Sequence, residues 1–137
     1  MKSSTIYYGI IPLGGSKMND YIINFLKKIM AIDSPSGYTK EVIHHCQKEA
    51  EKLGFQTKKT HKGNLEIYVE GQDDYTIGFC GHVDTLGLMV RSIKSDGTLT
   101  FTNVGGPIIP TLDGEYCRIH TRSGQCYTGT ILSNYPA

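Results

Sequence analysis

The residues best suited to chemistry in this sequence lie between positions 78 and 87, where His82 and Asp84 are separated by one residue. Imidazole is a common ligand of zinc and cobalt. In an extended segment the Asp84 carboxylate projects to the same side as the His82 ring, from where it can orient or polarise the ring. The pair therefore predicts a metal-ligating histidine, His82, supported by a carboxylate, Asp84. The same spacing also fits an ordinary hydrogen-bonded pair at the end of a strand, so this alternative stays open.

The other histidines do not complete a metal site. His44 and His45 fall within a predicted helix, where adjacent residues point about 100° apart and cannot easily share one ion. His61 lies in a predicted turn, and His120 lies on a predicted strand close to two arginines, whose charge disfavours a cation. We interpret all four as surface or packing residues.

Two helices are expected before this segment. Asn19 or Asp20 is a plausible N-cap for a helix that runs to about Met30, because apolar residues recur at helical spacing. Residues 34–37, Ser-Pro-Ser-Gly, then break the chain. A second helix is predicted from Thr39 to Leu53, with Gly54 at its C-terminal end.

Beyond Gly54 the hydrophobic period changes to two. Residues 55–59, 64–70 and 75–80 are therefore predicted strands. The run 76–80 is continuously apolar, which is typical of a central strand covered on both faces. Such a strand would deliver His82 and Asp84 at its carboxyl end, where ligands collect in open α/β sheets.

The last third of the chain has a different character. Residues 88–93 and 98–104 form one predicted hairpin, and residues 115–121 and 125–132 form another, with turns at 95–97 and 122–124. We therefore expect three parts: a poorly ordered leader at 1–17, an α/β part at 18–88 and a β-rich part at 89–137.

Composition narrows the functional classes. The chain has 137 residues, 39% of them hydrophobic and 20% charged, with a net charge of +1 and no basic stripe, so nucleic acid is an unexpected partner. No segment has the roughly 18 apolar residues of a membrane span. The four cysteines contain no CxxC pair, and an apolar strand-like run around Cys80 suits a buried thiol. These features favour reduced cysteines and a cytoplasmic protein.

Several motifs in order resemble the tetrahedral (TET) and glutamyl aminopeptidases, two-metal peptidases of bacteria and archaea. The resemblance begins near Met18 and includes the loop at 32–37, the helix with Glu41 and Val42, and a strand opened by residues 63–65. It continues through the Gly-His-Val-Asp element at 81–84 with residues 87–90, then residues 96–101 and the glycine pair at 105–106.

This resemblance implies an α/β fold, in which the chain forms the N-terminal part of a zinc-peptidase-like catalytic domain followed by the start of an inserted all-β, dimerisation-type domain. It implies His82 as the first ligand of a pair of divalent ions, zinc or cobalt, with Asp84 as its support. The expected substrate is a peptide, shortened from its N-terminus by a metal-activated water, and the expected assembly is a homo-oligomer.

The resemblance is incomplete at the catalytic centre. The family's bridging Asp, Glu-Glu pair, further Asp and distal His lie later in its chain, and this sequence contains no Glu-Glu dipeptide. One histidine and one supporting carboxylate cannot hold two ions, since each normally takes three or more protein ligands. We therefore expect the 137-residue chain alone to bind metal weakly or not at all and to be inactive.

Two alternatives remain open. Deacetylase-like and carboxypeptidase-like metallohydrolases also carry a strand ending in Gly-His-x-Asp-Thr, which residues 81–85 match. In those enzymes a loop usually follows, whereas this chain is predicted to continue as a strand. The other alternative is a non-catalytic, truncated subunit, which the missing ligands favour.

Overall fold

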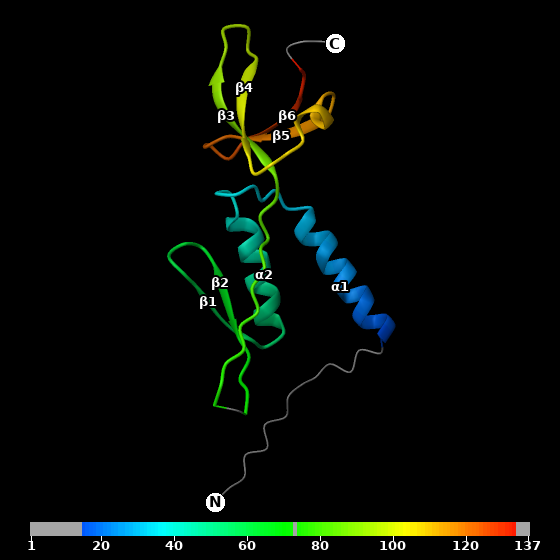
Figure 1. Ribbon diagram of the computed structural model, residues 1–137, viewed down its shortest axis with the longest axis vertical. Coiled ribbons are helices and arrows are strands. Elements are labelled where there is room, and N and C mark those ends of the chain that lie inside the picture. The colour runs from blue at the N-terminus through cyan, green and yellow to red at the C-terminus, as the bar shows by residue number, and fades with distance from the viewer. Residues whose placement is uncertain (1–14, 73, 134–137) are drawn as a thin grey trace, which may run out of the picture. The chain divides into compact units, whose positions relative to one another are not determined.

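A computed structural model describes residues 15–72 and 74–133 of the chain. The chain divides into two compact units, one ending at Thr85 and the other beginning at Leu86. Helices and antiparallel hairpins are both present (Figure 1), which confirms the predicted α/β class. Of the predicted leader, residues 1–17, the first fourteen positions lie outside the described residues. Its last three residues belong to the first helix.

Helix α1 spans Gly15–Met30, so it begins earlier than the N-cap predicted at Asn19 or Asp20. The physical reason is propensity, because Lys17 and Met18 are good helix formers and allow the helix to extend by a further turn.

One edge of α1 packs on α2, which spans Lys40–Lys52. Tyr21, Phe25 and Ile29 recur every four residues and are half-buried. The Tyr21 hydroxyl donates a hydrogen bond of 3.1 Å to the Glu49 carboxylate, and the Phe25 ring stacks on His45 with centroids 5.9 Å apart. His45 is thus a packing residue, as the sequence predicts.

The remaining apolar side chains of α1 are exposed. They are Met18, Ile22, Ile23, Leu26 and Met30. The helix is therefore amphipathic as predicted, but α2 covers only part of its apolar face.

Helix α2 ends in a Schellman motif, as the predicted terminal glycine requires. The Phe55 N–H donates to the Ala50 carbonyl at 3.0 Å, and the Gly54 N–H donates to the Glu51 carbonyl at 3.0 Å. Gly54 adopts a φ of +86°, in the left-handed region that favours glycine. The motif satisfies carbonyls of the last helical turn and redirects the chain into a strand.

That strand, β1 (Gln56–Lys59), pairs antiparallel with β2 (Leu65–Tyr68). The hairpin is tied to α2 by polar contacts: the Gln47 amide donates to the Thr57 hydroxyl at 3.1 Å, and that hydroxyl donates to Glu51 at 2.9 Å. The small core of this unit contains Val42, Ala50 and Ser34 as buried residues.

The prediction of a central strand at residues 75–80 is wrong. These residues form no strand, and Phe79 is 95% exposed. Cys80, expected to be buried, is also exposed, and all four cysteines are free thiols. A central strand needs a hydrogen-bonded neighbour on each side, and within the described residues no strand pairs with this run.

The second unit confirms both predicted hairpins. Strand β3 (Gly87–Ile93) pairs antiparallel with β4 (Leu99–Val104), and β5 (Tyr116–His120) pairs with β6 (Cys126–Thr130). A short 3₁₀ helix, η1 (Ile109–Leu112), precedes β5. None of the helices described is both long and apolar enough to cross a membrane.

Candidate functional site

His82 and Asp84 lie in irregular backbone of the first unit, after the run that was expected to be a strand. The His82 side chain is 84% exposed and that of Asp84 is 39% exposed. The prediction that His82 ends a central strand is therefore wrong in this structure, for the lack of pairing partners described above. The local backbone nevertheless brings the two side chains together.

The two side chains make a direct contact. His82 Nδ1 lies 2.9 Å from Asp84 Oδ1 and 3.3 Å from the main-chain oxygen of Asp84. A carbonyl and an ionised carboxylate only accept hydrogen bonds, so we infer that Nδ1 carries the proton. In the neutral ring Nε2 then presents a lone pair, which is the arrangement of a metal-ligating histidine.

The charge of Asp84 is stabilised by its neighbours. The hydroxyl of Ser36 donates to Asp84 Oδ2. This hydrogen bond, followed by the one from His82, lowers the pKa of the Asp84 carboxyl below its usual range. The carboxylate is therefore ionised at neutral pH and can act as the acceptor for the His82 ring.

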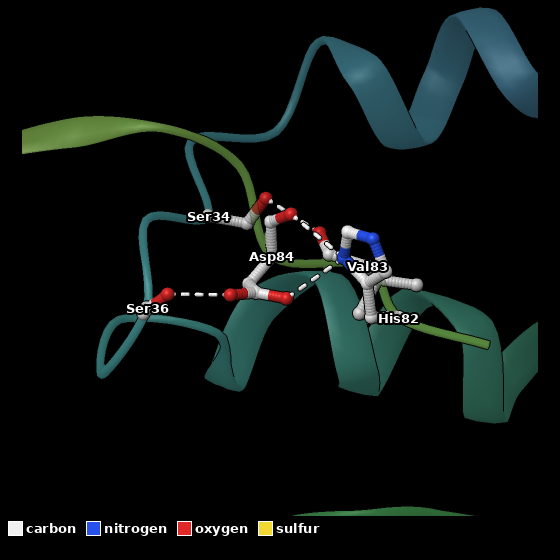
Figure 2. A network of polar contacts seen from close by, with 5 residues as sticks. All are labelled: Ser34, Ser36, His82, Val83 and Asp84. Atoms are coloured by element: carbon white, nitrogen blue, oxygen red, sulfur yellow. Dashed lines mark hydrogen bonds and ion pairs between the residues drawn. The ribbon is translucent and has the colours of Figure 1, made fainter. Parts of the chain in front are cut away.

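A loop distant in sequence holds this segment in place (Figure 2). The Ser34 hydroxyl donates to the Val83 carbonyl at 3.0 Å. The Thr85 N–H donates to the Ser34 carbonyl at 2.9 Å, and Pro35 forms an isolated parallel bridge with Thr85. Ser34 is fully buried. We call these contacts, together with the bond from Ser36 to Asp84, the loop clamp.

The local sequence explains the shape of the loop. Residues 35–38 form a turn closed by a 2.7 Å hydrogen bond from the Tyr38 N–H to the Pro35 carbonyl. Its third residue, Gly37, has a φ of +87°, as a type II turn requires. The turn places Ser36 at its second position, from where the hydroxyl reaches Asp84.

The pair lies on the wall of an open groove of about 680 Å³ in the first unit. Side chains from both helices and from the β1–β2 hairpin also line it, among them Tyr21, Cys46 and Leu65. Burial raises the pKa of the Cys46 thiol, so this group stays protonated at neutral pH. The groove leaves the His82 ring accessible to a ligand.

The other histidines lie on other elements of the two units. His44 is exposed on α2, and His61 is exposed in the turn between β1 and β2. His120 ends β5 in the second unit. Among the residues that the structure describes, no three His, Cys, Asp or Glu side chains gather as a metal site.

The serines of the loop clamp had no predicted role. Their sequence, Ser-Pro-Ser-Gly, indicated a break between helices, and it did so correctly. The turn type could have placed Ser36 at an exposed corner, but its partner Asp84 is 48 residues away. No local signal in the sequence connects the two.

Comparison with known proteins gives a consistent picture. A family model described as M42 glutamyl aminopeptidase matches residues 63–137. The putative aminopeptidase YhfE of Bacillus subtilis is 40% identical over 111 residues, which are 80% of this chain and 32% of that protein. The lysyl aminopeptidase of Pyrococcus furiosus is 29% identical over 103 residues, covering 74% of this chain and 30% of the relative.

Solved structures agree in fold. A TET aminopeptidase from a Thaumarchaeota archaeon of marine sediment superposes with a TM-score of 0.77 at 29% identity, over 85% of this chain and 32% of that one. The TET1 peptidase of Pyrococcus horikoshii, which can assemble into a tetrahedron or a large octahedral shell, gives 0.70 at 31% identity, over 85% and 34%. The chain thus spans about a third of the length of these relatives.

Proposed function

Because the chain belongs to the M42 glutamyl aminopeptidase family, we propose that it forms the N-terminal part of a metal-dependent aminopeptidase. In this proposal His82 is a ligand of one of two divalent ions, zinc or cobalt, and Asp84 orients its ring. The substrate is a peptide, and the product is a free N-terminal amino acid. The protein works in the cytoplasm as a homo-oligomer.

One observation carries the proposed role of His82. Both partners of Nδ1 are acceptors, at 2.9 and 3.3 Å, so the ring's other nitrogen has its lone pair free on an exposed edge. A histidine held in this tautomer by a carboxylate is what a metal ligand requires. An ordinary hydrogen-bonded pair, the alternative left open by the spacing, would make the same contact with Asp84, and the zinc titration below distinguishes the two.

The residues present fit one ligand of such a site and no more. His82 offers Nε2, whereas the described residues hold no cluster of three potential ligands. We propose that the other ligands and the general base are absent from this chain, so that the 137 residues alone are inactive. When bound, the ions would activate a water and polarise the scissile carbonyl. The contribution of this chain is to hold Nδ1–H on Asp84 and leave Nε2 available to an ion.

Two observations support the proposed homo-oligomer: the β-rich character of the second unit and the assembly of a related peptidase. The TET1 peptidase of Pyrococcus horikoshii can assemble into a tetrahedron or a large octahedral shell. We propose that the β-rich part, residues 89–137, begins the inserted domain through which this protein also associates, and that residues 18–88 belong to the catalytic domain.

The two competing hypotheses are weaker. Deacetylase-like and carboxypeptidase-like enzymes usually enter a loop after the Gly-His-x-Asp-Thr string, whereas here β3 starts at Gly87 and runs to Ile93. The hypothesis of a non-catalytic subunit is favoured only by the missing ligands. It makes a separate prediction, which is that the activity of the complete enzyme does not depend on His82.

Zinc titration followed by NMR of the histidine rings tests the proposal. Because this chain offers one ligand, we expect weak binding and carry the titration to excess zinc. We expect zinc to perturb Nε2 of His82 selectively, and we expect His82→Ala to show no comparably selective site. His61→Ala is the matched control, because His61 is an exposed histidine of the same unit and should not alter the response. A zinc response at His82 no stronger than at His61 would refute the ligand assignment. Metal content and cleavage of aminoacyl substrates complete the experiment, and turnover by the chain alone would disprove the expected inactivity.

A further inference from the structure

The two carboxylate oxygens of Asp84 have different partners. Oδ1 accepts from His82 Nδ1 at 2.9 Å, whereas Oδ2 accepts from the Ser36 hydroxyl. Figure 2 shows Ser36, Asp84 and His82 in this order, with the carboxylate between the hydroxyl and the ring. The two hydrogen bonds together determine the plane of the carboxylate.

We infer that Ser36 is a positioning residue, which sets the orientation of Asp84 and through it the tautomer of His82. The inference rests on the proposed function in one respect. The proposed function explains why this tautomer matters, because it leaves Nε2 available to a metal ion. The contacts on which the inference depends are all made within this chain.

The Asp84 carboxylate needs such a restraint. The terminal torsion of aspartate is broad and roughly two-fold, so the side-chain torsion alone does not hold the carboxylate in one plane. The side chain is 39% exposed, so water competes for its oxygens. A second hydrogen bond from a hydroxyl that is itself held in place restricts this rotation.

Ser36 is itself held in place by its turn. The hydrogen bond from Tyr38 to Pro35 closes the turn, and the parallel bridge between Pro35 and Thr85 joins it to the segment that carries the pair. The buried Ser34 donates a hydrogen bond to the main-chain carbonyl of Val83 in this segment. Ser34 therefore fixes the backbone, while Ser36 fixes one side chain, and substitutions at the two positions should have separable effects.

The arrangement is not that of a nucleophilic serine. In a Ser-His-Asp triad the histidine contacts the serine hydroxyl and takes its proton. Here the hydroxyl of Ser36 donates to the carboxylate, and the Nδ1 of His82 is occupied by Asp84. The geometry therefore supports a role in orientation rather than covalent chemistry.

The tautomer of His82 is the direct readout. It is measured by ¹⁵N NMR of the imidazole in the full 137-residue chain at about pH 8, above the ordinary pKa of histidine. We expect the Nδ1–H form to predominate in the wild type. In Ser36→Ala its ratio to the Nε2–H form should fall by about three- to tenfold, as for loss of one modest hydrogen bond. Ser36→Thr keeps the hydroxyl and should restore the wild-type ratio. Ser95→Ala, an exposed serine of the second unit, is the control and should change nothing.

A purely structural role for Ser36 predicts a different result, in which Ser36→Ala lowers the urea midpoint while the tautomer ratio stays that of the wild type. That outcome would overturn the inference, as would a wild type in which the Nε2–H form predominates. The zinc titration separates this test from that of the proposed function. A ratio that responds to Ser36→Ala, in a chain whose His82 responds to excess zinc no more strongly than His61, would support the positioning role and refute the metal assignment.

Discussion

Gly37→Ala would test whether the turn that presents Ser36 depends on a left-handed residue. The substitution adds a Cβ where φ is +87°, and apart from the adjoining residues no heavy atom lies within 4 Å of it. The effect is therefore conformational rather than steric. The left-handed region costs a non-glycine residue about 1–2 kcal/mol, whereas alanine loses about 0.4–1 kcal/mol less backbone entropy on folding than glycine. We expect the free energy of unfolding to fall by about 1 kcal/mol.

Urea unfolding followed by circular dichroism measures this change. With a slope of about 1–3 kcal/mol per molar urea, the midpoint should fall by about 0.3–1 M. Gly37→Asn should lose less, because asparagine tolerates this region. Gly71→Ala is the matched control, since Gly71 has no positive φ and its added Cβ would also lie in open space. An unchanged midpoint for Gly37→Ala, or an equal loss for Gly71→Ala, would refute the argument.

Three further predictions use the same chain. Tyr21→Phe removes the 3.1 Å hydrogen bond to Glu49 but keeps the ring, so the free energy of unfolding should fall by about 0.5–1.5 kcal/mol; an unchanged urea midpoint would contradict this. The folded-state pKa of Asp84 lies below its ordinary value, so the unfolded chain takes up this proton first as the pH falls. The stabilisation from Asp84 is thus complete above its unfolded pKa of about 3.9 and is lost as the pH falls through the folded pKa. Between about pH 5 and 3 the wild-type midpoint should therefore fall more than that of Asp84→Asn, and parallel pH profiles would count against the assignment. Phe79→Ser changes a side chain that is 95% exposed, so stability should stay within about 0.5 kcal/mol while binding of an apolar dye decreases; a large loss of stability would show that Phe79 is packed.

The parts of the fold that the sequence predicted well are those set by neighbouring residues. Gly54 ends α2 through hydrogen bonds that reach back only as far as Ala50. The turns of the β3–β4 and β5–β6 hairpins contain Gly97 and Gly124, both with positive φ, and the strands on each side pair directly across them. Such elements need no information from distant segments.

The parts predicted wrongly depend on segments far apart. An apolar run such as 76–80 indicates a buried strand only if other strands and helices cover it, and the sequence does not show whether they do. In the described residues these partners are missing, so Phe79 and Ile77 are exposed. The loop clamp was missed for a related reason, because Ser36 and Asp84 are separated by 48 residues.

The contact between His82 and Asp84 was predictable although the strand before it was not. It depends only on an extended backbone over three residues, in which positions i and i+2 face the same side. The clamp stabilises this part of the backbone through two hydrogen bonds that join Ser34 to Val83 and Thr85, the residues on each side of Asp84. A sheet is therefore not required to form the pair. It follows that the 137-residue chain should keep the His82–Asp84 contact without a strand at 75–80, and that the clamp should control the orientation of the His82 ring.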